Sequence, residues 1–563
     1  MTQASTAHPA GRSGPEQPEQ TGRNLPTGKG LPDLVRRRLA TVDNRLDRRS
    51  WLATAMIVAI AAVLRFVNLG TPPGKIFDEV YYAREGWALV DRGVEWNYQD
   101  DAPSYVVHPP LGKWLIGLGE WAFGYRDTEQ GIAAAGHLIT TAPEVGWRFS
   151  AALIGTLSVL LLVRIARRLF GSTVLGCAAG LLLALDGFHL VLSRTALLDI
   201  FLLFFVLASF GALVLDRDTR RRRWAETLTA GLNPGHPPAA DRPAGGWRTW
   251  PWWRLAAGVL FGCACAVKWS ALYFLPVFAL LVILWEVGAR RSAQVRRPWR
   301  RTLRDETPWL LLAGLLMVVT YLATWSGWLL GDEGFYRVPD AQRWPQAALS
   351  DTPVIGTLQN LIEYHRQAYG FHRQLDSAHT YQSWPWQWLL LARPVAFYWS
   401  GEGTCAAANC ATEVLLLGTP LLWWSFLPAL AALAWLGLAR RDWRAGAILL
   451  CVAAGILPWF WYATDSGRTM FSFYTAPALP FLVLAVTYVL GVIIGSPAAN
   501  ASAHTPQTPA AGDGGQRLVG AVIAGGFVLL VALNFAYFYP IFVGEPIPYD
   551  SWSNRMWLDS RWI

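Results

Sequence analysis

The sequence predicts an all-helical protein that crosses a membrane many times, and three observations support this fold class. Of its 563 residues, 53% are hydrophobic and only 15% are charged, and the mean hydropathy is positive. The chain holds many apolar stretches of the roughly 17–25 residues that a helix needs to cross a bilayer. Tryptophan is abundant, with 31 residues, and its half-apolar ring favours the membrane–water interface.

Eleven apolar segments are predicted as spans, and together they form one transmembrane domain over residues 51–540. The segments lie at about 51–69, 147–164, 172–190, 196–215, 255–267, 270–288, 308–329, 415–438, 445–463, 470–494 and 518–540. The fifth segment is short and can merge with the sixth, so ten or twelve spans are also compatible with the pattern.

Arginine clusters predict the orientation of the spans, because cytoplasmic loops carry an excess of Lys and Arg. The clusters are Arg36 to Arg38, Arg45, Arg48 and Arg49, then Arg164, Arg167 and Arg168, Arg220 to Arg223, Arg290, Arg291, Arg296, Arg297, Arg300 and Arg301, and Arg440, Arg441 and Arg444. They precede span one and follow spans two, four, six and eight, which places them all on one side. We therefore expect a multi-pass plasma-membrane protein with a disordered cytoplasmic tail at 1–50. The loops 70–146 and 330–414 and the C-terminal tail 541–563 then face outside.

The formal net charge of +9 also suits nucleic-acid binding. The arginines, however, sit in short loops between apolar segments, and membrane topology accounts for them. No nucleic-acid partner is predicted.

An acidic pair, Asp78 and Glu79, follows the first span directly. One carboxylate at the mouth of a membrane helix can accept a proton from an attacking hydroxyl, while the other holds the geometry of the site. A solvated loop start or a helix cap is the alternative interpretation.

The segment from His108 to Lys113 reads His-Pro-Pro-Leu-Gly-Lys. Its prolines fix the backbone, and the apolar run that follows is compatible with an interfacial helix. His108 and Lys113 would then lie at headgroup level, where a cation can hold a lipid-linked phosphate. A proline turn with a snorkelling lysine is the alternative.

Four cations occur at the outer ends of spans, against the charge rule. They are Arg65, Arg148, Arg194 and Lys268. An ionised group near the apolar core needs a partner. The acidic residues Asp78, Glu79 and Asp199 can supply structural ion pairs, whereas four cations on one face favour an anionic ligand such as phosphate.

Metal or nucleotide chemistry is not predicted. His365, His372 and His379 recur at a spacing of seven, but a polar, loop-like run interrupts the second interval. No P-loop, dinucleotide fingerprint or nucleophile elbow occurs. Cys405 and Cys410 lie close together in the second outer loop, where the extracytoplasmic side permits a disulfide bond.

These motifs resemble the protein O-mannosyltransferases of the GT-C class of membrane glycosyltransferases. The resemblance is carried by the Asp78-Glu79 pair, the His108–Lys113 segment, Arg194-Thr-Ala-Leu-Leu-Asp199, Val267-Lys-Trp-Ser270, and Met556-Trp-Leu-Asp-Ser-Arg-Trp562. His379-Thr-Tyr381 and Ser383-Trp-Pro-Trp-Gln-Trp388 resemble the bacterial branch. The second outer loop is too short for the β-trefoil domain of eukaryotic members.

The resemblance implies a GT-C fold and an inverting single displacement with Asp78 as base and Glu79 beside it. The donor would be polyprenyl-phosphate-mannose, with no other cofactor, and the acceptors Ser or Thr residues of secreted proteins. Contact with membrane lipid and an association with the secretion machinery are compatible with this. The residues assigned to the donor are Arg65, His108, Lys113, Arg148, Arg194, Asp199 and Lys268. Those assigned to the acceptor or to the lining of the site are Tyr81, His379, Tyr381 and Trp384.

Three alternatives remain at this point. A related GT-C enzyme acting on envelope lipid or polysaccharide would share the carboxylates after span one, although the intact His-Pro-Pro-Leu-Gly-Lys segment disfavours it. A transporter predicts charges deep within spans and paired repeats. A membrane scaffold gives no reason for the acidic pair.

Overall fold

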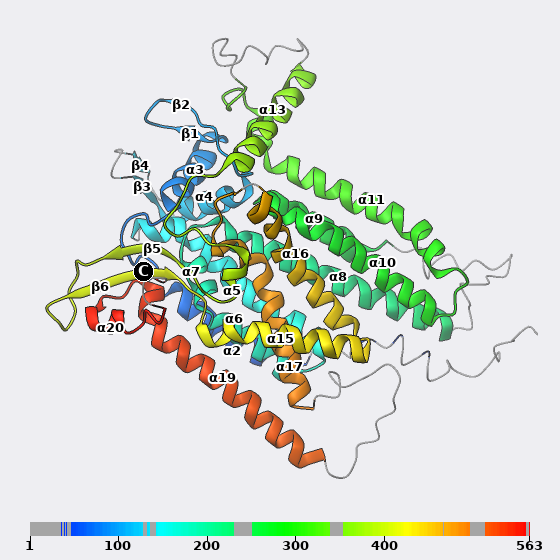
Figure 1. The fold of residues 1–563 in the computed structure, drawn as a ribbon. Coiled ribbons are helices and arrows are strands. Elements are labelled where there is room, and N and C mark those ends of the chain that lie inside the picture. Colours follow the sequence, from blue (N-terminus) through cyan, green and yellow to red (C-terminus); the bar gives the residue numbers. More distant parts are fainter. Residues whose placement is uncertain are drawn as a thin grey trace, which may run out of the picture.

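The computed structural model describes residues 47–127, 132–134, 142–229, 250–337, 353–465, 467–495 and 513–558, with residues 35, 39, 41 and 562 as single positions. Most of the tail predicted at 1–50, and part of the terminal motif that ends at Trp562, lie outside these residues. Figure 1 shows a slanted bundle of long helices with shorter elements gathered at one end.

Within the described residues, nine helices are long and apolar enough to cross a membrane. They are α2 (Arg48–Phe66), α5 (Pro143–Phe170), α8 (Leu198–Thr229), η1 with α10 (Trp269–Phe274 and Leu275–Ser292), α11 (Pro298–Thr324), α15 (Pro420–Arg440), α16 (Trp443–Asp465), η2 with α17 (Ser472–Ala478 and Leu479–Ile493) and α19 (Asp513–Val543). A pair of helices bent by 62°, α6 (Thr173–Ala184) and α7 (Gly187–Arg194), passes the same test together, either as a broken tenth span or as a re-entrant loop. The multi-span helical fold predicted from hydropathy is confirmed.

Each of the eleven predicted segments is helical, but their lengths differ from the prediction. The fifth, α9 (Trp252–Cys265), has 14 residues, which rise only about 21 Å and fall short of the ~30 Å hydrocarbon layer. Conversely, α8 continues to Thr229 and α11 begins at Pro298, well beyond their apolar windows. Hydropathy marks only the apolar part of a helix, and ion pairs keep these polar turns helical.

Short elements occupy one end of the bundle, as the loops predicted to face outside would. The first loop contains α3 (Glu79–Arg92), α4 (Leu111–Phe123) and the strand pairs β1–β2 (Trp96–Asn97, Ala102–Pro103) and β3–β4 (Tyr125–Asp127, Ile132–Ala134). The second contains α12 (Ser326–Leu330), α13 (Pro353–Gln374), α14 (Pro385–Trp388), β5 (Val395–Ser400) and β6 (Cys410–Leu416).

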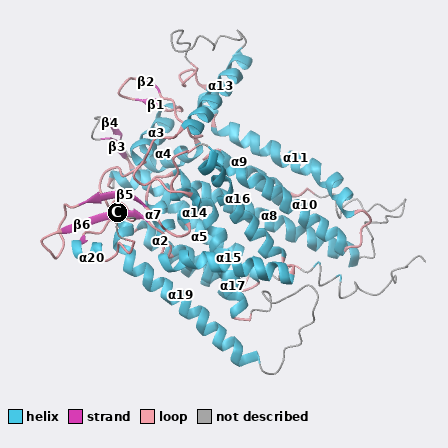
Figure 2. Ribbon diagram, viewed as in Figure 1, coloured by secondary structure: helices cyan, strands magenta, loops and turns pink. Residues whose placement is uncertain are grey.

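A three-stranded antiparallel sheet ties the C-terminal segment to the second loop. Strand β6 pairs with β5 in the register Ala396↔Leu415, and with β7 (Ile547–Pro548) in the register Ala411↔Ile547. Helix α20 (Tyr549–Ser553) follows β7, and Figure 2 shows the sheet at the same end as α3 and α4. A disulfide bond joins Cys405 and Cys410 between β5 and β6, as the sequence predicts.

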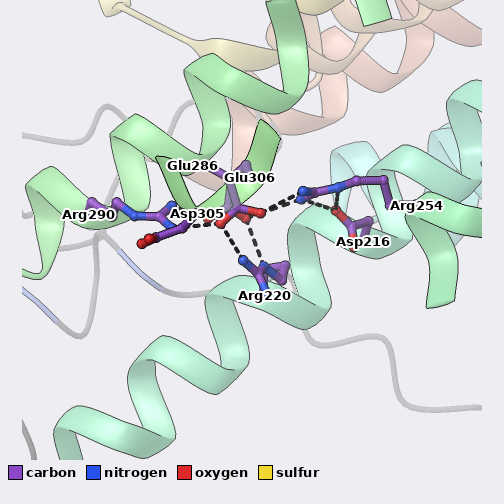
Figure 3. A network of polar contacts seen from close by, with 7 residues as sticks. All are labelled: Asp216, Arg220, Arg254, Glu286, Arg290, Asp305 and Glu306. Atoms are coloured by element: carbon purple, nitrogen blue, oxygen red, sulfur yellow. Dashed lines mark hydrogen bonds and ion pairs between the residues drawn. The ribbon is translucent and has the colours of Figure 1, made fainter. Parts of the chain in front are cut away.

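An ion-pair network joins four helices away from this sheet (Figure 3). Its members are Asp216 and Arg220 of α8, Arg254 of α9, Glu286 and Arg290 of α10, and Asp305 and Glu306 of α11. Glu306 accepts from Arg220 at 2.5 Å, from Arg254 at 2.6 Å and from Arg290 at 2.6 Å. Asp199 and Arg220 both lie on α8, about 30 Å apart at ~1.5 Å per residue. The network is therefore about one hydrocarbon thickness from Asp199.

Candidate active site

Asp78 stands at the start of α3 without serving as a helix cap. It occupies the N-cap position, but its side chain makes no capping hydrogen bond. Burial raises the pKa of its carboxyl to about 6, the nearby Lys268 opposes the rise and Asp199 adds to it. The helix-cap alternative weighed for the sequence is therefore not what this side chain does. Its carboxylate remains chemically available and titrates near neutral pH.

The backbone just before Asp78 is held in an unusual conformation. Phe77 has a φ of 49°, in the left-handed region that non-glycine residues enter rarely. Its ring stacks on Phe397 of β5, with centroids 4.4 Å apart and an interplanar angle of 9°. The second outer loop thus fixes the turn that presents Asp78, and strained turns of this kind gather at functional sites.

Glu79, the adjacent carboxylate, is fully engaged and fully buried. It accepts two hydrogen bonds from Arg148 of α5, each 2.9 Å long. It also accepts from the backbone N–H groups of Ile76 and Ala196, each at 3.0 Å. The remaining Arg148 donors reach carbonyl oxygens of the segment after α2, among them Pro72 at 2.8 Å. Glu79 and Arg148 therefore join α3, α5 and the α7–α8 junction.

Lys268 and Asp199 form a second pair near Asp78. Lys268 precedes η1 in extended backbone, and its Nζ donates to Asp199 Oδ2 at 2.7 Å. Both residues are buried, and Lys268 Nζ lies 5.6 Å from the centre of the Phe473 ring. Since a lysine ammonium has three donors, the bond to Asp199 leaves donors for an anionic ligand.

His108 reaches the same region because its segment is tied to the end of α9. Leu111 N donates to Ala266 O at 3.0 Å. The His108 ring lies 5.0 Å from that of His372 of α13 and 6.4 Å from that of Tyr82. Burial lowers the pKa of His108 well below its usual range, with nearby Lys268 adding to the effect. A lowered pKa favours the neutral imidazole, so His108 is not the cation at the phosphate that the sequence suggested.

Two residues that the sequence did not single out as donor ligands complete the cluster. His372 Nε2 donates to Val107 O at 2.9 Å, and burial lowers its pKa to about 4. Arg468, between α16 and η2, donates to His372 O and lies 3.4 Å from Tyr474 Oη. Its buried Nε has no hydrogen-bond partner among the described residues. Arg468 does not belong to a recognisable sequence motif, and only the fold shows that it lies beside His372.

The other predicted donor-binding cations have protein partners. Arg65 is fully buried and contacts His189 Nδ1 at 2.7 Å and Ser193 Oγ at 3.3 Å. Arg194 donates to four carbonyl oxygens at the end of α2, the shortest bond being 2.7 Å to Asn68 O. A cation at the C-terminus of a helix is electrostatically favoured there. These contacts give both residues a role in holding α2 against α7.

Lys113 of α4 is likewise paired within the protein. Its Nζ donates to Glu95 Oε1 at 2.6 Å and lies 3.7 Å from Glu85 Oε2. The side chain is fully buried. Two carboxylates balance its charge, so Lys113 holds α4 against α3 and is not a free cation.

The four residues predicted for the acceptor lie at different distances from the cluster. His379 packs on Phe471, with ring centroids 5.0 Å apart, and Phe471 stacks on Phe473 at 5.1 Å. Phe473 is the ring beside Lys268, so a row of aromatic rings connects His379 to the site. The ring of Tyr381 lies 5.9 Å from that of His379 and beneath Arg393, Trp384 stacks on Trp386, and Tyr81 has an exposed side chain.

The three regularly spaced histidines do not converge. His365 contacts Tyr321 Oη at 2.6 Å, His372 faces His108, and His379 accepts from the Tyr381 backbone at 3.1 Å. Among the described residues, no three His, Cys, Asp or Glu side chains are grouped to hold a metal ion.

The cluster thus combines one available carboxylate with paired and unpaired cationic donors and neutral imidazoles. The carboxylate can accept a proton, and the cationic donors can stabilise negative charge on a departing phosphate.

Comparisons with known proteins identify the family. The family model "Dolichyl-phosphate-mannose-protein mannosyltransferase" matches residues 55–236, and "C-terminal four TMM region of protein-O-mannosyltransferase" matches residues 357–562. The polyprenol-phosphate-mannose–protein mannosyltransferase of Mycolicibacterium smegmatis is 39% identical over 530 residues, covering 92% of this chain and 94% of the relative. That of Corynebacterium glutamicum is 32% identical over 539 residues, with coverages of 92% and 94%.

A solved structure shows the same fold. The Saccharomyces cerevisiae Pmt1–Pmt2 complex bound to its sugar donor matches with a TM-score of 0.66 at 15% identity, over 94% of each chain. Fold, site and matches together define a multi-span membrane glycosyltransferase. The chain belongs to the polyprenol-phosphate-mannose–protein mannosyltransferase family, and the resemblance seen in its motifs is confirmed.

Proposed function

We propose that this protein transfers mannose from polyprenyl-phosphate-mannose to Ser or Thr hydroxyls of secreted proteins, at the outer face of the plasma membrane. The observation that carries the proposal is the position of Asp78, a carboxylate free of capping bonds beside the Lys268–Asp199 pair. The relatives whose names include this donor and a protein acceptor match along nearly their whole length.

The reaction is a single displacement at the anomeric carbon. Asp78, when ionised, takes the proton of the acceptor hydroxyl, and the hydroxyl oxygen forms the new bond to the sugar. The bond from the anomeric carbon to the phosphate oxygen breaks, and polyprenyl phosphate leaves with the bonding electrons. The anomeric configuration is inverted. The donor is already activated, so no nucleotide is required.

Lys268 and Arg468 are the cations best placed for the leaving phosphate. Lys268 retains donors beyond its bond to Asp199, and Arg468 has a buried Nε without a partner among the described residues. Preorganised donors aimed at developing charge contribute strongly to catalysis. Neutral His108 adds a hydrogen bond to the same head group, whereas His372, whose one N–H donates to Val107 O, can only accept a hydrogen bond from a sugar hydroxyl. In this proposal Arg65, Lys113, Arg148 and Arg194 position the site, and none of them binds the donor directly.

Asp199 holds Lys268 in place, and His379, Tyr381, Trp384 and Tyr81 lie on the side from which an acceptor would approach. The family chemistry requires an extended acceptor segment to reach Asp78 from the aqueous phase. The aromatic row from Phe473 to His379 provides a surface for it, which leads outward from the cluster.

The proposed orientation puts this cluster outside and the Arg220 network inside. An impermeant thiol reagent added to intact cells should label a cysteine at Tyr81 and spare one at Arg223. Labelling of the Arg223→Cys protein from outside would contradict the orientation.

Activity is tested with membranes that contain the protein, radiolabelled polyprenyl-phosphate-mannose and a Ser/Thr-rich peptide. Label should enter the peptide and survive lipid extraction. An Asp78→Asn preparation should be inactive, and Asp100→Asn, which changes an exposed carboxylate of the same loop, should be active. Label that entered lipid or polysaccharide instead would favour the related envelope glycosyltransferase.

A further inference from the structure

Helix α13 of the second outer loop has one face that the rest of the protein covers. Leu361, Tyr364 and Ala368 are buried along this face. Leu361 and Tyr364 belong to an aromatic cluster with Trp325 and Trp328, which lie at the outer end of α11 and in α12. Tyr364 Oη also accepts from the Val106 backbone N–H at 3.1 Å. This face anchors α13 to the bundle.

A second face of α13 is apolar and uncovered. Ile355 is 53% exposed, Leu358 48%, Ile362 53% and Tyr369 58%. Their spacing of three, four and seven residues places them in one stripe along the helix, because a helix turns about 100° per residue. A stripe of large apolar side chains in water is costly, and such surfaces mark a contact with a partner or a membrane.

Polar and charged residues border the stripe, although Val354 and Phe371, which lie off it, are also 72% and 45% exposed. Gln359, Glu363 and Gln367 follow the stripe on the side opposite Leu361 by helical periodicity. Gln359 Oε1 is buried and Gln367 accepts from Tyr336 Oη, whereas the Glu363 side chain is 41% exposed and pairs with Arg366 at 3.5 Å. Arg366 and Arg373 lie along the edge of the stripe, both exposed. An apolar stripe flanked by arginines and followed by a polar face is typical of a helix lying in the membrane interface, where the arginines meet lipid phosphates.

The position of α13 agrees with this. Figure 1 shows it leaving the bundle at the end of α11 that carries the outer loops, and running away beyond α11 rather than along it. α11 lies at the edge of the bundle, and Leu311, Leu315 and Val318 on it are exposed. Since α11 is a candidate membrane span, we expect these residues to face lipid, and α13 packs against the outer end of this helix through Trp325 and Trp328.

We propose that α13 is an interfacial helix, and that its Ile355–Leu358–Ile362–Tyr369 face lies in the outer leaflet at the boundary between phospholipid headgroups and acyl chains. A second copy of the chain fits the face less well. In a second copy packed parallel to the first, Arg366 and Arg373 would meet the same residues of that copy, whereas lipid phosphates can neutralise them.

The inference stands apart from the sugar-transfer chemistry, but it bears on it. His372 occupies the last turn of α13 and faces His108. A helix held in the headgroup plane therefore fixes the level of this imidazole relative to the membrane.

The test uses the full chain in vesicles of phosphatidylcholine and phosphatidylglycerol. An environment-sensitive fluorophore is attached at Ile362→Cys on the stripe, or at the adjacent Glu363→Cys on the polar face. Unsubstituted protein, with its native free cysteines, gives the labelling background. The emission of the Ile362 probe should be blue-shifted, and a nitroxide near the lipid headgroup should quench it several-fold more than aqueous iodide does. The Glu363 probe should be quenched more by iodide than by the nitroxide.

Two outcomes would overturn the proposal. Equal quenching of both probes by iodide would place the stripe in water. Shielding of the Ile362 probe from both quenchers would indicate a protein partner, including a second copy. The charge component is tested separately. Changing Arg366 and Arg373 to Glu should raise iodide quenching of the Ile362 probe in vesicles that contain phosphatidylglycerol.

Discussion

Arg148 donates Nε to Glu79 Oε1 and Nη2 to Glu79 Oε2, each at 2.9 Å. Asp78, one residue earlier, receives no capping bond from its helix. The two adjacent carboxylates therefore differ in their partners. Glu79 is paired with Arg148 and stabilises the fold, whereas Asp78 is available to react. This contrast separates the predictions for the two positions.

Asp78→Asn should lower turnover by a factor on the order of 10²–10⁴, the usual effect of losing a general base. Donor affinity should stay close to that of the unmodified protein, because Asn keeps the shape and the cations are unchanged. Since burial disfavours the charged carboxylate, the variant should unfold at no lower a temperature. Turnover, donor binding and thermal unfolding of purified protein measure these effects. Near-normal turnover of Asp78→Asn would show that another residue is the general base.

The activity should depend on pH through the same carboxyl group. Asp78 acts as a base only when ionised, and its pKa is raised to about 6. The value of kcat/KM should therefore fall as the pH drops below about 6 and level off above it. Burial also raises the pKa of Glu413 in β6, to about 7. In the Glu413→Gln variant, kcat/KM should still fall below about pH 6. If that fall disappeared in this variant, Glu413 would be the group that titrates.

Arg148→Met should destabilise the protein, because it leaves Glu79 charged and buried without its main partner. Breaking such a buried pair typically costs about 3–5 kcal/mol. The double variant Glu79→Gln with Arg148→Met should recover part of the loss. Unfolding in detergent, followed by tryptophan fluorescence, provides the measurement. If Arg148→Met unfolded normally and only weakened donor binding, the guanidinium would be a donor ligand after all.

Lys268→Met should weaken donor binding roughly ten- to a hundredfold, as expected for about 1.5–3 kcal/mol from a charged hydrogen bond. The change also leaves Asp199 unpaired, so a double variant with Asp199→Asn is the control for folding. The double variant should restore stability without restoring affinity. Recovery of donor affinity in the double variant would show that Lys268 serves only to neutralise Asp199.

The network in Figure 3 offers a matched pair of substitutions on neighbouring residues. Glu306→Gln weakens three arginine contacts and should cost several kcal/mol of stability, whereas Asp305, which makes one contact at 3.4 Å, should tolerate Asn with little change. Because the network is about 30 Å from Asp199 along α8, any Glu306→Gln protein that folds should have a normal donor affinity. A selective loss of affinity would reveal coupling along α8.

Hydropathy was sufficient for the multi-span helical fold, because each crossing helix must be apolar over its own length, although it counted the short α9 as a span. The motif residues Asp78, His108, Asp199 and Lys268 were also found from the sequence, and the structure brings them together. The polar ends of α8 and α11 were missed, since their helical state depends on ion pairs between helices that no local window records.

The roles of the cations could not be read from the sequence. Arg65, Arg148 and Arg194 lie at span ends just as Lys268 does. Only the fold shows which of these cations donate their hydrogen bonds to groups within the protein. Arg468 illustrates the converse. It follows a span in an ordinary-looking polar turn, and its meeting with His372, nearly a hundred residues earlier, depends on how the two outer segments pack.

Helix α8 is fixed by ion pairs near both ends, at Asp199 to Lys268 and at Arg220 to Glu286 and Glu306. A helix pinned in this way cannot shorten its apolar section by sliding or tilting independently, so the surrounding lipid must deform to match it. Such deformation costs fractions of a kcal/mol for each ångström of mismatch. The protein should accordingly show an acyl-chain-length optimum, with sugar transfer declining in bilayers that are either thinner or thicker than its own apolar belt.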